Sequence, residues 1–263
     1  MTSFPLPTLG SRVSRAWETL AALTVGGIRE DRDFTPLGVL KWVVEPLLFT
    51  AVYFVLLVAV LGRTGNNRLL FLLCALLPYR YFSGVAAGSL NLIGRHSSIL
   101  TNRSFPRFVL PLVLMGTEGL TFCISLLFLV PFMVFYGIAP TPAMVWLPVI
   151  LVVLGVLSSG VAYLGTVLGL YFPDLRGLVQ NLIRVGFFMS TGLVRGRAPG
   201  ETLPDLLRAN PLSGIFDSMR AVVINGRSPS TRDLVYPLAV GLVLLGIGIA
   251  VYRQREPQFA KEV

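Results

Sequence analysis

Charge is scarce in this sequence, and that scarcity defines its class. Only 13% of the 263 residues are charged while 54% are hydrophobic, and no charged residue lies between Glu118 and Asp174. A soluble domain of this length needs more polar surface to cover its core. Because about 20 helical residues cross the hydrocarbon core of a bilayer, the uncharged stretch holds most of one span and all of another. We therefore expect an all-α polytopic membrane protein rather than a soluble helical bundle.

Histidine, lysine and cysteine are also rare, which excludes most site chemistry. His96 is the only histidine, and the only lysines, Lys41 and Lys261, do not follow a G-x-x-x-x-G motif. Cys74 and Cys123 lie inside apolar runs and read as small hydrophobic residues. The sequence thus lacks a histidine-based metal cluster, an intramembrane Ser–His dyad and a Walker A loop. We predict no catalytic residue, no metal and no nucleotide hydrolysis by this chain.

Apolar runs predict six helical spans within a transmembrane domain at residues 36–252. A polar, Pro-rich start without a cleavable apolar segment argues against a signal peptide. Residues 11–32 have helical apolar spacing around Trp17, which predicts an interfacial amphipathic helix within residues 1–35. Residues 253–263 form a polar tail, and GVLSSG at 155–160 is typical of small-residue helix packing. The spans are expected at about residues 36–61, 69–93, 108–137, 144–171, 178–193 and 234–252.

Arginines set the orientation of these spans. Basic residues are more numerous in the segments on the same side as both termini, which the positive-inside rule assigns to the cytoplasm. The net charge of +9 then reflects cytoplasmic loops and lipid headgroups rather than nucleic acid. We expect a multi-pass protein of the bacterial cytoplasmic membrane with both termini inside.

The long exterior loop at residues 194–233 contains its own helix signals. In NPLSGIFDSMRAVVING, Asn210 is an expected N-cap, Pro211 the first helical position, and Asn225-Gly226 the stop. The helix is too short to span a bilayer, so we expect it at the outer interface, preceded by a short helical piece in LPDLLR. Its apolar face comprises Leu212, Ile215, Phe216, Met219, Val222 and Val223.

Ionisable residues inside spans are functional candidates, because each is costly in lipid. Arg80 and Glu118 lie near the middle of spans that run in opposite directions, so we expect both to face the protein interior and to pair. Glu45 and Arg184 lie shallower and form a candidate second pair. A structural ion pair and a role in substrate passage both stay open.

Aromatic residues interrupt two of the spans. They are either packing and interfacial residues, or the lining of a channel on which sugar rings stack. The sequence leaves both interpretations open. The residues are Tyr79, Tyr81, Phe82, Phe187 and Phe188.

Five stretches carry a resemblance to a known family. They are RDFTPLGVLKWVVEPLLFTAVYF, SFPRFVLPL, FPDLRGLVQ, the NPLSGIFDSMRAVVING block and REPQFAKEV. Over nearly its whole length the chain resembles the permease subunit of ABC-2 type exporters, in the branch that exports polysaccharide, O-antigen and teichoic acid. Arg80 departs from the family pattern, which has an uncharged and often aromatic residue there.

This resemblance implies partners and roles. A second copy would complete the pore, two separate nucleotide-binding subunits would hold ATP and Mg, and the substrate would be a lipid-linked glycan. The exterior helix resembles a gate helix, with Pro211, Phe216, Met219 and Arg220. The ATPase would be contacted by a coupling segment and a second turn, which together comprise Arg95, His96, Ser97, Ser98, Ile99, Leu100, Asp174 and Arg176.

Other functions remain as alternatives. An ABC-2 permease for a small hydrophobic molecule or drug would need an apolar cleft rather than a polar and aromatic channel. A secondary transporter would use Glu118 as a proton site and would work without an ATPase. A membrane enzyme acting on lipid-linked sugars would need a convergent acid or metal site, which the spans lack.

Overall fold

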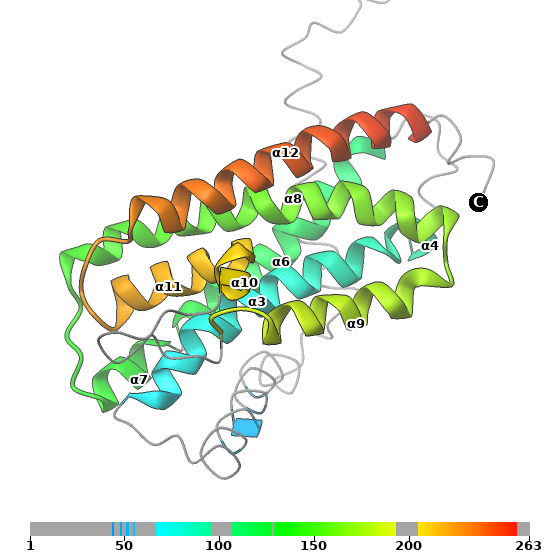
Figure 1. The fold of residues 1–263 in the computed structure, drawn as a ribbon. Coiled ribbons are helices and arrows are strands. Elements are labelled where there is room, and N and C mark those ends of the chain that lie inside the picture. Colours follow the sequence, from blue (N-terminus) through cyan, green and yellow to red (C-terminus); the bar gives the residue numbers. More distant parts are fainter. Residues whose placement is uncertain are drawn as a thin grey trace, which may run out of the picture.

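The computed structural model describes residues 67–95, 107–127, 129–192 and 205–256, with five further helical positions, Val44, Leu48, Ala51, Val52 and Val55. Every regular element in these residues is a helix, as the all-α prediction requires (Figure 1). The predicted N-terminal amphipathic helix, Glu45 and residues 96–100 lie outside the described residues.

Four segments are long and apolar enough to cross a membrane, and they match predicted spans two, three, four and six. The first is α3, Arg68–Ser89. The second comprises the 3₁₀ turn η2 at Arg107–Val109, α6 at Leu110–Leu127 and α7 at Leu129–Phe135. The third joins η3, Pro142–Trp146, to α8, Leu147–Tyr171. The fourth, α12, covers Thr231–Arg255 and so extends three residues into the predicted polar tail.

The fifth predicted span is shorter than expected. The helix there, α9, covers Leu175–Phe188, so it starts three residues earlier and ends five residues earlier than predicted. Its 14 residues rise about 21 Å, which is less than the ~30 Å hydrocarbon core. For the first predicted span, the five described positions are helical and exposed. Six complete spans therefore stay a prediction.

Helices α8 and α12 lie side by side in the same direction along most of their length (Figure 1). Glycines allow this approach: a Cβ atom on Gly160 would lie 2.6 Å from the backbone nitrogen of Leu245, and one on Gly241 would lie 2.8 Å from that of Leu157. Small residues at such crossings let membrane helices pack backbone to backbone. The predicted packing role of the GVLSSG stretch is confirmed at Gly160.

Helix α3 lies at the centre of the bundle, against α6, α8, α9 and α11. Its first half is buried from Leu70 to Leu77. Outward faces of the other helices carry large apolar side chains, such as Val134, Val152 and Val243, at 71%, 64% and 62% exposure. This pattern, with apolar residues both inside and outside, is typical of helices surrounded by lipid.

Candidate functional site

Helix α11, Pro211–Val223, is the predicted gate helix, and its ends are those that the sequence indicates. The side-chain oxygen of Asn210 accepts a hydrogen bond from the backbone N–H of Leu212 at 3.0 Å, which confirms the predicted N-cap. The amide nitrogen of the same side chain donates to the carbonyls of Gly186, at 2.7 Å, and Met189, at 3.3 Å. The Asn210 side chain therefore caps the start of α11 and also bonds carbonyls at the end of α9.

The apolar face of α11 is covered by protein. The six residues predicted for this face are all at most 4% exposed and belong to the main core cluster. The helix lies across α3 and the beginning of α12, so these side chains meet other helices and not an outer lipid interface. The predicted face is confirmed, and α3 and α12 supply the apolar surface that it meets. That the helix lies at or dips into the outer interface stays a prediction.

Arg220, predicted as a gate residue, is buried and bonds groups from three segments of the chain. Its guanidinium donates to the carbonyls of Thr191, at 2.8 Å, and Gly192, at 2.7 Å, and more weakly to that of Phe71 at 3.4 Å. It also lies 3.6 Å from the ring centroid of Phe71 and pairs with Asp217 at 2.9 Å. The Arg220 cluster, formed by these five residues, joins α11 to α3 and to the turn after α9.

Burial shapes the electrostatics of this pair. The side chain of Arg220 is 7% exposed and that of Asp217 is 40% exposed. Burial lowers the pKa of the Arg220 guanidinium below its ordinary value, and the nearby Asp217 opposes that change. Partial burial raises the pKa of the Asp217 carboxyl, against the effect of Arg220. Arginine keeps its proton in proteins, so the cluster holds a buried cation.

Both residues of the predicted intramembrane pair, Arg80 and Glu118, line one small cavity. Arg80 from α3 and Glu118 from α6 face it together with Tyr81, Thr121 and other residues. The Glu118 carboxylate lies against α3, since a Cβ atom on Gly84 would be 2.7 Å from one of its oxygens. Both side chains thus face the interior, whereas a direct ion pair between them stays a prediction.

The second predicted pair is not brought together in the described residues. Arg184 is exposed on α9, and its guanidinium donates to the side chain of Asn181 on the same helix at 3.5 Å. Glu45 lies outside the described part of the chain. The second pair stays a prediction.

Most of the predicted channel aromatics pack inside the bundle. The ring centroids of Tyr79 and Phe187 are 4.4 Å apart, and Phe187 is fully buried. Tyr81 is 6% exposed and its ring lies 5.7 Å from that of Phe122. Phe82 packs against the same core, while Phe188 is 49% exposed. Phe187 and Tyr81 are thus packing residues within this chain, Tyr79 and Phe82 are partly buried, and Phe188 is exposed. A channel lined by these rings stays a prediction.

The opposite end of the bundle contains the start of α6, which follows the predicted coupling segment. The hydroxyl of Tyr252 donates to the carbonyl of Arg107 at 2.7 Å, and that of Tyr163 donates to the carbonyl of Phe108 at 3.1 Å. The Arg107 guanidinium donates to the carbonyl of Glu256 at 3.1 Å. The described part of the SFPRFVLPL motif, from Arg107 on, is therefore held between α8 and the last turns of α12.

The two predicted ATPase contacts start at this same end. Helix α4, Leu92–Arg95, contributes Leu92 and Ile93 to the cluster that contains Tyr163 and Tyr252. The turn before α4 packs its Leu90 carbonyl against Gly169 near the end of α8. Gly169 in turn accepts a hydrogen bond from the Arg176 guanidinium at 2.8 Å.

Their roles as contacts remain predictions. Arg176, in the first turn of α9, bonds the carbonyl of Gly169 in α8, while Asp174, in the turn between the two helices, is exposed. Arg95 is the last residue of α4, and the five coupling residues that follow it lie outside the described residues.

Sequence reasoning missed several members of these sites. Asp217, Thr191 and Gly192 were not singled out, and neither were Tyr163 and Tyr252. The spacing of Asp217 and Arg220, three residues apart on a helix, was a readable signal. The other contacts involve backbone carbonyls, for which the sequence gives no signal.

Comparison with known proteins gives relatives of one kind, although no protein-family model matches the chain. The O-antigen export system permease protein RfbA of Klebsiella pneumoniae is 27% identical over 247 residues, which cover 93% of this chain and 95% of the relative. RfbA of Myxococcus xanthus is 28% identical over 233 residues, or 86% and 88%. The polysialic acid transport protein KpsM of Escherichia coli is 25% identical over 248 residues, or 90% and 93%. The resemblance to permeases of ABC-2 type polysaccharide exporters is thus confirmed.

Proposed function

We propose that this chain is the permease subunit of an ATP-driven exporter that moves a lipid-linked polysaccharide across the bacterial cytoplasmic membrane. The similarity to three polysaccharide-export permeases over 86–93% of the chain carries this proposal. The four candidate spans support a membrane location. A second copy of the chain completes the pore, and two separate subunits bind ATP and Mg and hydrolyse the nucleotide.

The arrangement at the α4 end supports a coupling role there. The start of α4, the start of α6 and the end of α12 belong to one apolar cluster around Tyr163 and Tyr252. A force applied to the segment between α4 and α6 therefore acts on packed side chains from α8 and α12. The segment itself, with Ile99 and Leu100, supplies the apolar residues that dock against the ATPase.

Purification in native detergent tests the proposal. The chain is expected to purify with a nucleotide-binding subunit, and cells that lack that subunit are expected to lose export. The double variant Ile99→Asp and Leu100→Asp should release the ATPase and stop export, because two carboxylates cannot enter an apolar docking cleft. Ser228→Asp, in the exposed connection between α11 and α12, is the matched control.

Three outcomes would overturn the proposal. Export without any nucleotide-binding subunit would indicate a secondary transporter. Unchanged ATPase association in the Ile99 and Leu100 variant would remove the coupling role from this segment. Export of a small hydrophobic compound with normal surface polysaccharide would indicate a drug permease.

A further inference from the structure

A cavity of about 500 Å³ lies between α10, α11 and the first turns of α12. Helix α10 covers Asp205–Ala209. The volume is within the ~300–1,000 Å³ that is usual for small-molecule sites. The cavity is at the end of the bundle where α12 begins, which the sequence predicts to be the exterior side (Figure 1). None of the roles proposed above uses it.

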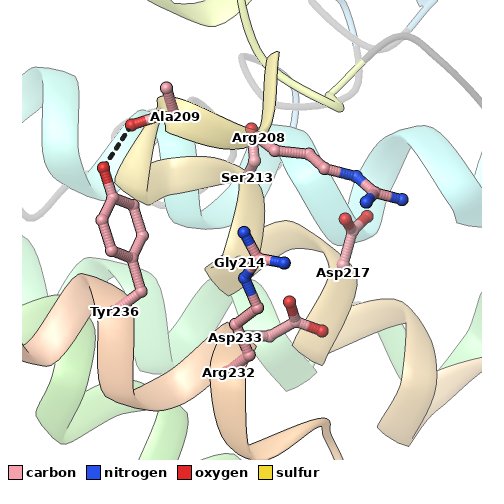
Figure 2. A pocket seen from close by; sticks show the side chains of 8 residues that line it. All are labelled: Arg208, Ala209, Ser213, Gly214, Asp217, Arg232, Asp233 and Tyr236. Atoms are coloured by element: carbon pink, nitrogen blue, oxygen red, sulfur yellow. Dashed lines mark hydrogen bonds between the residues drawn. The ribbon is translucent and has the colours of Figure 1, made fainter. Parts of the chain in front are cut away.

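Four charged side chains of both signs line the cavity, and one of them, Asp217, is also paired with Arg220. Figure 2 shows the side chains of Arg208, Arg232, Asp217 and Asp233 directed into the same space. Two guanidinium groups thus face two carboxylates. The ring of Tyr236 forms one wall and is 40% exposed.

Contacts between the helices fix the shape of this cavity. The Tyr236 hydroxyl donates to the carbonyl of Ala209 at 2.6 Å, which joins α12 to α10 and sets the ring orientation (Figure 2). Gly214 lets α11 approach the first turn of α12, because a Cβ atom there would lie 2.5 Å from the carbonyl oxygen of Asp233. Ser213 is 3% exposed and its hydroxyl already bonds the carbonyl of Leu207 and the N–H of Thr191. Tyr236 and Ser213 are therefore held in place before any ligand arrives, whereas the side chains of Arg208 and Arg232 are exposed.

The presence of both signs of charge favours one class of ligand over others. A pyrophosphate or other polyanion would meet Asp217 and Asp233, and a metal ion would meet two guanidinium groups. Within the described residues there is no group of three or more side chains able to hold a metal ion. A sugar ring suits the lining better, because each hydroxyl donates to a carboxylate and accepts from a guanidinium, while the ring of Tyr236 offers an apolar face.

We propose that this cavity binds a neutral sugar unit of the exported glycan after it has crossed the membrane. The inference rests on the proposed polysaccharide export function and adds to it a site made by one chain alone. Asp217 also belongs to the Arg220 cluster, so a sugar bonded to this carboxylate contacts the ion-pair partner of the arginine that holds α11 to α3. Through Asp217, the cavity therefore borders the ion pair that helps to hold the predicted gate helix, α11, in place.

Binding to the purified permease in lipid nanodiscs is the direct test. The probes are glucose, galactose, mannose, N-acetylglucosamine and oligosaccharides hydrolysed from the glycan that the cells export, with inorganic pyrophosphate as the anionic comparison. Binding is measured by saturation-transfer difference NMR and by competition. The wild type is expected to bind at least one neutral sugar and not pyrophosphate.

Asp233→Asn and Arg232→Gln are the test variants, because each removes one charge from the cavity; the first keeps the side-chain size, and the second shortens the side chain but keeps a polar amide. Each should weaken sugar binding by about tenfold or more, since hydrogen bonds to charged groups contribute ~1.5–3 kcal/mol. The control is Arg227→Gln, an exposed arginine outside the cavity, which should bind like the wild type. Thermal stability of each variant in detergent shows whether it is folded.

The outcomes separate this inference from the proposed function. Binding of pyrophosphate alone, absence of neutral sugar binding, or sugar binding that both cavity variants retain would overturn the sugar site. If the ATPase co-purifies and glycan is exported in any of these cases, only the site is wrong. If neither is found, the proposed function fails independently of the cavity.

Discussion

Replacing Arg220 by methionine tests whether the Arg220 cluster holds the gate helix in place. Methionine keeps much of the aliphatic stem, which packs on Phe71, but removes the charge and every hydrogen bond. The carbonyls of Thr191 and Gly192 lose their donors, and both residues are buried. Each buried carbonyl left without its donor costs ~1–3 kcal/mol, whereas the Asp217 carboxylate, whose side chain is 40% exposed, is left to solvent.

Two companion variants separate the charge from the backbone contacts. Arg220→Lys keeps the charge but lacks the planar guanidinium, so it cannot serve three carbonyls at once and should lose most of the same stability. Asp217→Asn leaves the arginine bonded to these carbonyls. Because the Asp217 side chain is 40% exposed, solvent weakens the pair and the loss should be about 1 kcal/mol or less.

The assay is the temperature at which half of the protein stays monodisperse on size-exclusion chromatography after heating in one detergent. Arg220→Met should be the least stable, Arg220→Lys close to it, Asp217→Asn nearer to wild type, and Arg227→Gln equal to wild type. Only this order is compared, since such unfolding is irreversible. If Arg220→Met were as stable as Arg227→Gln, the cluster would not hold α11 and the reasoning would be wrong.

Five further variants probe three helix contacts by the same assay. Gly160→Ala should destabilise the protein by ~1–3 kcal/mol, because its Cβ atom meets the α12 backbone. Gly155→Ala is the control: there is open space around Gly155, so this variant should be neutral or up to about 1 kcal/mol more stable. Equal effects of the two variants would contradict the packing of α8 on α12. Asn210→Asp keeps the N-cap acceptor but loses the donor to the end of α9, so it should be less stable than the wild type. Asn210→Ala should be less stable still, because it also loses the N-cap hydrogen bond, which contributes ~0.5–2 kcal/mol. Tyr252→Phe removes the bond to the Arg107 carbonyl and should cost ~1 kcal/mol; an unchanged midpoint would show that this bond is not needed.

Local signals predicted α11 almost to the residue, while α9 was misjudged. Residues at or next to its ends signal where α11 begins and ends: Asn210 and Pro211 at the start, and Asn225-Gly226 after the last turn. The end of α9 depends instead on the Asn210 amide, which donates to Gly186 from 24 residues away. A helix end set by such a distant donor leaves no local trace, so the apolar run suggested a longer span.

The functional residues were predictable to the extent that side-chain chemistry is local. Arg220 was singled out as a gate residue, but its partners Phe71 and Thr191 contribute backbone carbonyls from other elements. Tyr79, Tyr81 and Phe82 were grouped by adjacency, yet neighbouring helix positions point about 100° apart. That rotation sends Tyr79 toward Phe187 and Tyr81 toward Phe122, so one channel wall cannot contain them all.

Helix α12 connects the two ends of the described structure. Near its start, Tyr236 bonds the carbonyl of Ala209 beside the cavity, and near its end Tyr252 bonds the carbonyl of Arg107 beside the predicted coupling segment. Between them, close contact at Gly160 holds α12 against α8. A movement of the start of α6 must therefore either break the Tyr252 bond or carry α12 with it.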